Sequence, residues 1–511
     1  MRTDPSHPAT VCGPAGSAAV AGGSPDAVAA AVQVLRAGGS SVDAALAAVL
    51  AAAVSEPALT SLGGGGFLLH AEPHGDPRVL DFFVDIPGRG GGGVDAHVET
   101  VVIDFAAAGP AASASEQVFH GGWGTVAVPG CFSGYLDAHR RWGRLPLADV
   151  VAPAAALARA GATLSPVQRQ FMTLVGGLLA LTPQSRLMFA EVAATGRFVN
   201  PDYAALLDAL ADGRIADLAD ASFAGPLLAA ARTGGGLLTA DDLAAYRSQL
   251  REPLCVGHRG ARVWTNPPPS VGGSIVADAL SRLPDDLGGR DGRWSVVAEV
   301  LADATARRRG PGQVPTGTTH VSVVDADGGL AAITTSNGSG SGTVVPGWGV
   351  TLNNMLGEED LHHDHSEPLP AGVRMGSMMA PTLVRLADGS MVVLGTGGSE
   401  RIRSALLGVL VRLIDDGDEL GRAVAASRMH VGGTGPIHVE PGFAADDRAA
   451  LERLAASRGW PAVEAWPSAN VFFGGVHAVR RAPDGSVEAV GDSRRGGAAS
   501  VVLPDGGVVS A

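Results

Sequence analysis

The first strongly apolar part of the chain carries the start and stop signals of two helices. The segment Ser24-Pro25-Asp26 supplies a capping side chain, a proline in the first helical position and an acid in the first turn, and Gly38-Gly39 ends that helix. A second helix is predicted from Ser41 to a point before Pro57. It contains the longest apolar stretch, Val42 to Val54, which at 13 residues is too short to cross a bilayer.

The segments that follow predict strands first and then helices. The glycine run of Thr60 to His70 leads into one strand, and the mostly apolar run Val79 to Val84 predicts another. Residues 131–256 have mainly helical patterns. Helix-start signals occur at Asp149 to Pro153, at Leu238 to Tyr246 and, as a rigid proline turn, at Pro267 to Ser270.

The pattern changes after residue 317. Thr319 to Val324 alternates like a strand, Asp325 to Gly329 is a turn, and Leu330 to Ser336 is a second strand, which together predict a hairpin. Two similar units follow, at Leu383 to Leu394 and at Val476 to Val490. We therefore expect an α+β protein with a helix-rich N-terminal part and a β-rich C-terminal part.

The hairpin brings two hydroxyl side chains together in either of its possible registers. A two-residue turn at Asp327-Gly328 places Thr318 opposite Asn337, whereas a three-residue loop places Thr318 opposite Ser336. Thr318 therefore lies within one register step of Ser336, and such side chains can meet across a ladder. A threonine-rich hairpin without any catalytic role explains the same pattern, because threonine favours strands.

The amino-acid composition excludes several catalytic mechanisms and one class of partner. The 511 residues correspond to roughly three domains or one large fold. All 37 basic residues are arginine, so Schiff-base lysines, Ser–Lys dyads and Walker-type phosphate lysines are excluded. The net charge of −14 argues against nucleic acid as the main partner.

The cysteines and the first twenty residues indicate the cellular compartment in which we expect the protein. The three cysteines, Cys12, Cys131 and Cys255, are widely spaced and form no CxxC pair, so neither a disulfide framework nor a zinc ribbon is predicted. The first twenty residues lack a basic flank followed by a leucine-rich run, and we identify no signal peptide. We therefore expect a cytoplasmic protein with no membrane partner.

The segment before the hairpin favours a catalytic role for Thr318. Residues 307–317 are basic, rich in proline and glycine, and typical of a linker. A cut between Gly317 and Thr318 would release an α-amine, which titrates near 8 in model compounds. That amine can accept the proton of the same residue's hydroxyl, so that one residue supplies both nucleophile and base without lysine or histidine.

A series of short blocks along the chain resembles one known family, the γ-glutamyltranspeptidases, which are N-terminal nucleophile hydrolases. The blocks are GGGGF (63–67), VAVPG (126–130), LTADDLAAY (238–246), the PPPS–GG segment (267–273), TTHVSVVDADG (318–328), LNN (352–354), APT (380–382), GTGGSERI (395–402) and DSRRGG (492–497). They occur in the family's order and cover nearly the whole chain from about residue 24. Such a series is far more specific than a single motif.

The resemblance implies a fold and a catalytic centre. The family's fold is a four-layer αββα sandwich, and its precursor cleaves itself before the nucleophile, here Thr318, into a large subunit 1–317 and a small subunit 318–511 that stay associated. The supporting hydroxyl corresponds to Ser336. Backbone N–H groups of Gly398 and Ser399, with Gly397 one step away, correspond to the oxyanion hole. No cofactor or metal is implied.

The resemblance is weaker where the family binds the γ-glutamyl group of its substrate. The carboxylate-binding arginine that follows a Leu-Asp-Phe strand is replaced by Phe83, and we consider Arg89 a candidate substitute. Of two carboxylate-binding serines, Ser377 is retained and the other position is Met378. On the amino side the family's residues correspond to Asn337 and Glu358, while the residue after the LNN block is Met355.

Three functions remain open at this stage. The first is a γ-glutamyltransferase or glutathione hydrolase; the second is an acylase of the same fold with a glutaryl or cephalosporin-type acyl group; the third is an uncleaved homologue that only binds a small molecule. Other motifs weigh less. We interpret His362 to His365 as a solvated loop rather than a metal tract, reject Gly88 to Gly93 as a dinucleotide site, and interpret Arg494-Arg495 as a solvated pair.

Overall fold

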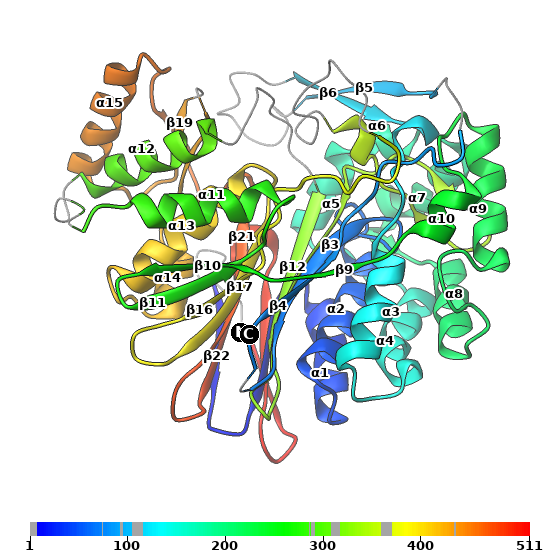
Figure 1. Ribbon diagram of the computed structural model, residues 1–511, viewed down its shortest axis with the longest axis horizontal. Helices are drawn as coiled ribbons and strands as arrows, with labels where there is room; N and C mark the ends of the chain where they lie inside the picture. The colour runs from blue at the N-terminus through cyan, green and yellow to red at the C-terminus, as the bar shows by residue number, and fades with distance from the viewer. Residues whose placement is uncertain are drawn as a thin grey trace.

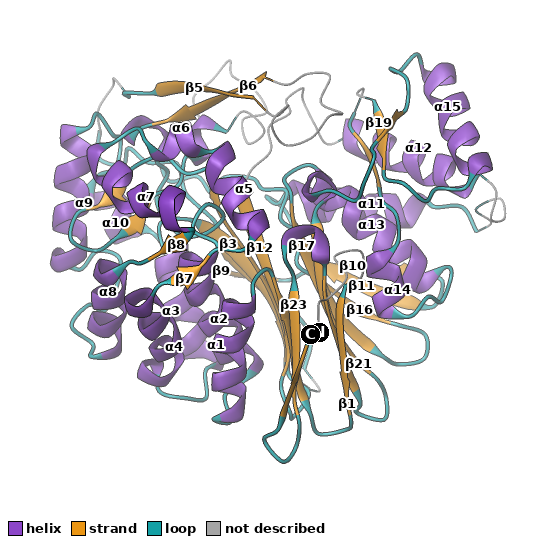
Figure 2. Cartoon of the chain, turned by 180° about the vertical axis from the view of Figure 1, so that it is seen from behind, coloured by secondary structure: helices purple, strands orange, loops and turns teal. Residues whose placement is uncertain are grey.

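A computed structural model describes residues 8–73, 75–91, 96–104, 116–285, 287, 292–307, 317–358, 370–433 and 436–511. Of the expected linker, only Arg307 and Gly317 lie among these residues. Two antiparallel sheets pack face to face at the centre and helices cover both outer faces, as Figures 1 and 2 show. This arrangement confirms the expected αββα sandwich.

The eight-stranded sheet carries the predicted hairpin in its middle. Its strands, in spatial order, are β24 (Val508–Ser510), β23 (Ala498–Val502), β2 (Ala18–Gly22), β12 (Gly317–Val324), β13 (Leu330–Gly338), β3 (Gly65–Ala71), β4 (Arg78–Phe82) and β9 (Gln249–Arg251). Alternate residues face opposite layers. Val321 and Ile333 pack toward the helices, whereas Val324 and Ala332 pack toward the second sheet.

The seven-stranded sheet lies against the inner face of the first. Its order is β1 (Ala9–Gly13), β22 (Val487–Gly491), β21 (Gly475–Arg481), β17 (Met391–Gly397), β16 (Thr382–Arg385), β11 (Ala261–Thr265) and β10 (Leu254–His258). Smaller pairings are β5 (Glu99–Asp104) with β6 (Glu116–Gly121), β7 (Ala162–Thr163) with β8 (Arg197–Phe198), β14 (Val344–Val345) with β15 (Val350–Thr351), and β18 (Met429–Val431) with β19 (Ile437–Val439) and β20 (Glu464–Ala465).

The helices form the two outer layers (Figure 1). On the side of the eight-stranded sheet lie α1 (Pro25–Arg36), α2 (Ser41–Ser55), α3 (Cys131–Trp142), α4 (Leu147–Ala160), α5 (Pro166–Leu174), α6 (Gly176–Leu179), α7 (Pro183–Thr195), α8 (Pro201–Ala211), α9 (Ala221–Thr233) and α10 (Ala240–Ala245). On the other side lie α11 (Val271–Arg282), α12 (Arg293–Ala306), α13 (Arg401–Ile414), α14 (Leu420–Ala425) and α15 (Ala445–Arg458). Among the described residues, no helix has both the length and the apolar character needed to cross a membrane.

Local chemistry explains most helix boundaries. Ser24 caps α1 by accepting from the N–H of Ala27, as predicted, and Ser40 forms a capping box with Asp43 at the start of α2. Ser270 precedes α11 after the proline turn. One signal was misplaced: α4 begins at Leu147, and Pro153 lies inside it.

Both predicted subunits contribute strands to each of the two large sheets. On each side of Thr318 the sequence contributes strands to both sheets: β12 and β13 pair with β2 and β3, while β16 pairs with β11 and β22 pairs with β1. The two predicted fragments are therefore interleaved within one core rather than folded as separate domains.

Candidate active site

Thr318 lies at the start of β12, near the middle of the eight-stranded sheet. Thr319 pairs with Thr335 and Gly317 pairs with Gly338, so a β-bulge leaves two residues, Ser336 and Asn337, opposite Thr318. The hairpin turn is a three-residue loop, Ala326 to Gly328, with Gly328 in the left-handed region. Of the two registers that the sequence left open, the structure has the one set by the three-residue loop, and the bulge gives Thr318 both of the neighbours that the two registers predicted.

The Ser336 hydroxyl contacts the peptide group that joins Gly317 to Thr318. Its Oγ donates a hydrogen bond to the carbonyl oxygen of Gly317 and accepts one from the N–H of Gly338 at 3.0 Å. The carbonyl that it contacts belongs to the predicted scissile bond. A donor at this position stabilises negative charge that develops on the oxygen when the carbon is attacked.

The predicted oxyanion turn lies beside Thr318, the predicted nucleophile. A Cβ on Gly397 would lie 2.1 Å from the carbonyl oxygen of Thr318, so only glycine permits this approach. Gly398 and Ser399 both have positive φ, +129° and +51°, and lead directly into α13. Successive amides in such turns can face one anion, and the positive end of the helix dipole adds to their effect.

Two charged side chains near Thr318 were not found from the sequence. Arg495 donates from Nη1 to the carbonyl oxygen of Thr318 at 3.3 Å and is only 6% exposed, so its interpretation as part of a solvated pair was wrong. Glu56, just beyond α2, accepts at 2.8 Å from the hydroxyl of Thr319. Burial raises the pKa of the Glu56 carboxyl to about 7, although the hydrogen bond from Thr319 opposes this.

Further along β12 from Thr318, a chain of buried polar groups lies between the two sheets. His320 hydrogen-bonds through Nδ1 with the Thr334 hydroxyl at 2.7 Å and through Nε2 with the Ser322 hydroxyl at 2.9 Å. Because Ser322 donates its only proton to the carbonyl oxygen of His477 at 3.1 Å, Nε2 of His320 is the protonated nitrogen. Burial and the neighbouring His477 lower the pKa of His320 well below its ordinary value, so the ring is neutral.

The structure brings together the residues expected on the amino side of the substrate. The N–H of Ser339 donates to Asn354 Oδ1 at 2.8 Å and to Glu358 Oε1 at 3.1 Å. Asn337, two residues earlier, donates from Nδ2 to the carbonyl oxygen of Leu352 at 3.2 Å. Asn337 and Glu358 therefore belong to one buried loop cluster next to the bulge. Asn354, in the LNN block, was not singled out as a site residue.

The carboxylate side is apolar. Gly65 pairs with Ser336, and a Cβ on Gly65 would lie 3.1 Å from the Cα of Phe83. Phe83 is thus about two strands, or roughly 10 Å, from Ser336. Phe83 is 1% exposed, and its ring stacks on that of Phe67 at a centroid distance of 5.7 Å. It belongs to a core cluster that also contains five buried methionines, Met355, Met375, Met378, Met379 and Met429.

The nearby cations already have partners. Arg89 donates to the carbonyl oxygen of Gly372 at 3.2 Å. Arg374, which the sequence did not single out, is buried and contacts Asp81 at 2.8 Å and Asp85 at 2.5 Å. The role of Arg89 as a substitute carboxylate clamp stays a prediction.

Ser377 lies in a segment that contacts the first residue of α11. Its hydroxyl accepts from the N–H of Met379 at 3.1 Å, and its carbonyl oxygen accepts from the N–H of Val271 at 2.8 Å. No hydrogen bond between described residues joins it to Thr318 or Ser336. The substrate-binding role of Ser377 stays a prediction.

Among the described residues, no group of three or more His, Cys, Asp or Glu side chains is arranged to hold a metal ion. The tract His362 to His365 and part of Gly88 to Gly93 lie outside the described residues.

A four-layer αββα sandwich, with a buried threonine at the start of an inner strand and a glycine turn beside it, defines the class of N-terminal nucleophile hydrolases. The family model described as Gamma-glutamyltranspeptidase matches residues 27–310 and 295–502. The chain belongs to the gamma-glutamyltranspeptidase family.

Its relatives include both transpeptidase-type and acylase-type enzymes. The Acylase ACY 1 proenzyme of Pseudomonas sp. (strain SE83) is 30% identical over 519 residues, which cover 91% of this chain and 89% of that protein. The Glutathione hydrolase proenzyme of Pseudomonas aeruginosa is 29% identical over 460 residues, or 78% and 80% of the two chains. A cephalosporin acylase structure from Bacillus halodurans has a TM-score of 0.74 at 25% identity and covers 100% of this chain and 97% of its own.

Proposed function

We propose that the chain cuts itself between Gly317 and Thr318. The Thr318 hydroxyl attacks the Gly317 carbonyl carbon, the carbon–nitrogen bond breaks, and the hydroxyl proton moves to the released α-nitrogen. Water then hydrolyses the resulting ester, which leaves a Gly317 carboxylate and a free Thr318 with its hydroxyl and α-amine restored. The hydrogen bond from Ser336 Oγ to the Gly317 carbonyl oxygen is the observation that carries this proposal.

The same residue then cleaves a substrate amide. The α-amine accepts the Thr318 hydroxyl proton as the oxygen attacks the substrate carbonyl, and it later protonates the leaving amine. Backbone N–H groups at Gly398 and Ser399 stabilise the oxyanion. Water or an acceptor amine releases the acyl group from Thr318. No step requires a cofactor.

The first test follows the cut itself. Wild-type protein should run as two bands on a denaturing gel, and N-terminal sequencing of the smaller band should begin Thr-Thr-His. Thr318→Ala should stay whole and inactive, whereas Thr318→Ser, which keeps a hydroxyl, should still be cut. Wild-type protein that stays a single chain after long incubation, with no amide cleaved, would contradict the proposal and favour a binding protein.

Two acyl groups are candidates, and different observations favour each. The cluster of Asn337 and Glu358 favours a γ-glutamyl amide such as glutathione, because it offers acceptors for an α-ammonium group. The stack of Phe83 on Phe67 favours an acyl group without an α-carboxylate, because a buried aromatic ring offers no partner for that charge.

Matched anilides separate the two candidates. γ-Glutamyl and glutaryl p-nitroanilide share the terminal carboxylate and differ only in the α-amino group, whereas pentanoyl p-nitroanilide lacks both charged groups. An acylase should release p-nitroaniline from the glutaryl or the pentanoyl compound with a higher kcat/KM than from the γ-glutamyl compound. Phe83→Arg should raise kcat/KM for the two compounds that carry the carboxylate, whereas Phe83→Leu, which keeps the site apolar, should not. If wild type prefers the γ-glutamyl compound and Phe83→Arg brings no gain, the acylase candidate is wrong.

A further inference from the structure

Arg495 contacts both halves of the catalytic centre. Its Nη1 donates to the carbonyl oxygen of Thr318 at 3.3 Å. A Cβ on Gly397 would lie 2.8 Å from the same Nη1, and one on Gly398 would lie 3.3 Å from Nη2. The guanidinium is thus packed between the backbone of the nucleophile and the oxyanion turn. The glycines of that turn leave room for it.

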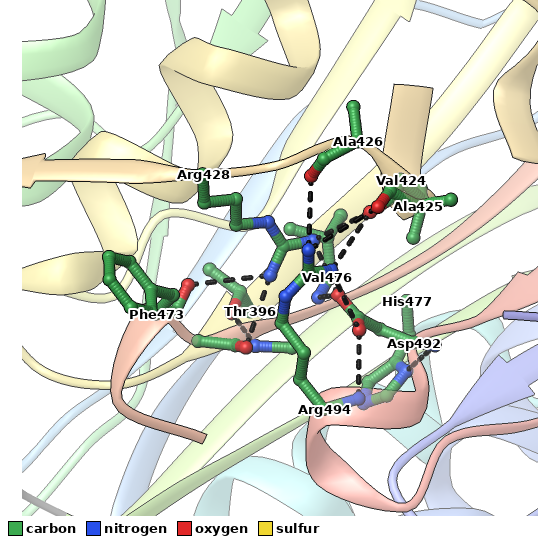
Figure 3. Close-up of polar contacts among 12 residues, drawn as sticks. Thr396, Val424, Ala425, Ala426, Arg428, Phe473, Val476, His477, Asp492 and Arg494 are labelled. Carbon is green, nitrogen blue, oxygen red and sulfur yellow. Dashed lines mark hydrogen bonds and ion pairs between the residues drawn. The ribbon is translucent and has the colours of Figure 1, made fainter. Parts of the chain in front are cut away.

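A network of buried ion pairs holds the segment that carries Arg495. Figure 3 shows its centre, Asp492, which contacts Arg428 and accepts from the N–H of Val476 at 2.9 Å. Arg494 contacts Asp492 at 3.3 Å and Glu440 at 2.7 Å. Burial alone would raise the pKa of Asp492, but Arg428 and Arg494 outweigh it and lower that pKa to about 2. Asp492 is therefore charged throughout the neutral range.

The same network reaches the strand that leads into the oxyanion turn. Arg428 Nη1 donates to the carbonyl oxygen of Gly474 at 3.1 Å, and the N–H of Gly475 donates to the hydroxyl of Thr396 at 2.9 Å. A Cβ on Gly475 would lie 2.6 Å from the Cβ of Arg495, so this glycine makes room for the arginine stem. The same buried network therefore contacts both the segment that carries Arg495 and the strand β17 that leads into the oxyanion turn.

We propose that Arg495 is a positioning residue that sets the register of Thr318 against the oxyanion turn, both in self-cleavage and in substrate turnover. The inference rests on the proposed function. Arg495 acts through the carbonyl oxygen of Thr318 and does not itself touch the reacting atoms. A charged donor on that oxygen fixes the peptide plane and hence the direction of the hydroxyl and of the α-amine.

The positive charge of Arg495 also affects the protonation of the released α-amine of Thr318. A cation next to Thr318 favours the neutral form of the released α-amine, which is the form that acts as a base. Burial and, after it, the neighbouring Arg401 lower the pKa of Arg495 to about 9, which leaves it charged at pH 7. Among the described residues, the charged or titratable groups around this position include Glu56 beyond α2, Arg401 on α13, Asp492 and Arg428 in the network, and two neutral histidines, His477 on β21 and His320 on β12.

The experiment compares Arg495→Met, Arg495→Lys and Arg494→Met with wild type. Arg495→Met should slow self-cleavage by about 10- to 100-fold, the range expected for a lost charged hydrogen bond. In whatever protein matures, the acid limb of the kcat/KM–pH profile should move up by roughly one pH unit. Arg495→Lys, which keeps the charge, should restore the profile and part of the rate.

Arg494→Met is the matched control, because Arg494 belongs to the same network without contacting Thr318. It should lower the melting temperature and leave the midpoint of the acid limb unmoved. If wild type is cut and Arg495→Met matures at the wild-type rate with an unshifted profile, the positioning role is wrong while the proposed function stands. An Arg495→Lys variant as impaired and shifted as Arg495→Met would also overturn it. If wild type itself is never cut, both proposals fall together.

Discussion

At the scale of single residues, the contact between Ser336 and the Gly317 carbonyl predicts a selective defect. Ser336→Ala removes one donor from the scissile carbonyl and should slow self-cleavage by about 10²- to 10³-fold, which is typical for a lost oxyanion donor. Ser336→Thr keeps the hydroxyl and should be cut at a rate close to wild type. Timed denaturing gels after purification measure both rates, and equal rates for Ala and wild type would contradict the role.

The buried Glu56 predicts a stability that depends on pH. Its pKa is raised in the folded state from 4.5 to about 7, so the folded protein holds the proton more tightly than the unfolded chain does. The contribution of Glu56 to the free energy of unfolding is therefore fully present below pH 4.5 and is lost as pH rises through 7. The loss is on the order of 3 kcal/mol.

Glu56→Gln, which cannot titrate, should remove this part of the pH dependence. Measured in the Thr318→Ala background, the drop in melting temperature from pH 5 to pH 8 should be smaller for Glu56→Gln than for its parent. An identical drop in both proteins would show that Glu56 does not titrate in this range.

Thr318 and Ser336 could be predicted because hairpin pairing is local: a turn signal and two alternating segments limit the register to two choices. Arg495 and Glu56 could not, since nothing in their neighbourhood distinguishes a buried charge from a solvated one. Their partners, Thr318 and Thr319, lie 177 and 263 residues away. Family resemblance drew attention to the DSRRGG block but not to what its second arginine touches.

At the scale of elements, the turn between β17 and α13 gives a steric prediction. Gly397→Ala places a methyl group 2.1 Å from the Thr318 carbonyl oxygen, so self-cleavage should fall by at least about 100-fold as Thr318 is displaced. Gly408→Ala, in the middle of α13, meets nothing within 4 Å and should raise stability by up to about 1 kcal/mol. Gels and thermal unfolding of the two variants check this, and a fully cut Gly397→Ala would refute the close approach.

Most elements could be predicted from caps, glycines and alternation, as α1, α2, β3 and the β12–β13 hairpin illustrate. The β-bulge at Thr318 could not be predicted, because the one extra residue of a bulge leaves no signal in the alternating pattern of either strand. Pro153 was misplaced for a related reason: packing of α4 against α2 and α8 tolerates a proline that local rules would put near a helix start.

At the scale of the whole molecule, the interleaved strands predict that the fragments stay together after the cut. Each sheet contains strands from both sides of Thr318, so separation would break ladders such as β12 with β2 and β16 with β11. The two fragments should co-elute in native size-exclusion chromatography and separate only in denaturant. Independent elution at neutral pH would contradict the interleaving.

The layered architecture followed from the resemblance of the blocks, whereas the strand order that interleaves the predicted fragments did not. Long-range pairings such as β1 with β22 depend on the packing of both sheets and leave no local signal in either strand. The preference for one acyl group likewise depends on non-local contacts, namely on which side chains lie beyond Gly65.

The burial of Thr318, only 2% exposed, determines when the proposed cut can happen. We expect that neither a protease nor a neighbouring copy reaches Thr318 in the finished fold, so the proposed cut should proceed within one molecule, at a rate independent of concentration. An unfolded or misfolded chain lacks the assembled groups and stays intact. The nick would thus serve as a permanent record that this particular copy had once folded correctly, readable on a gel long after synthesis.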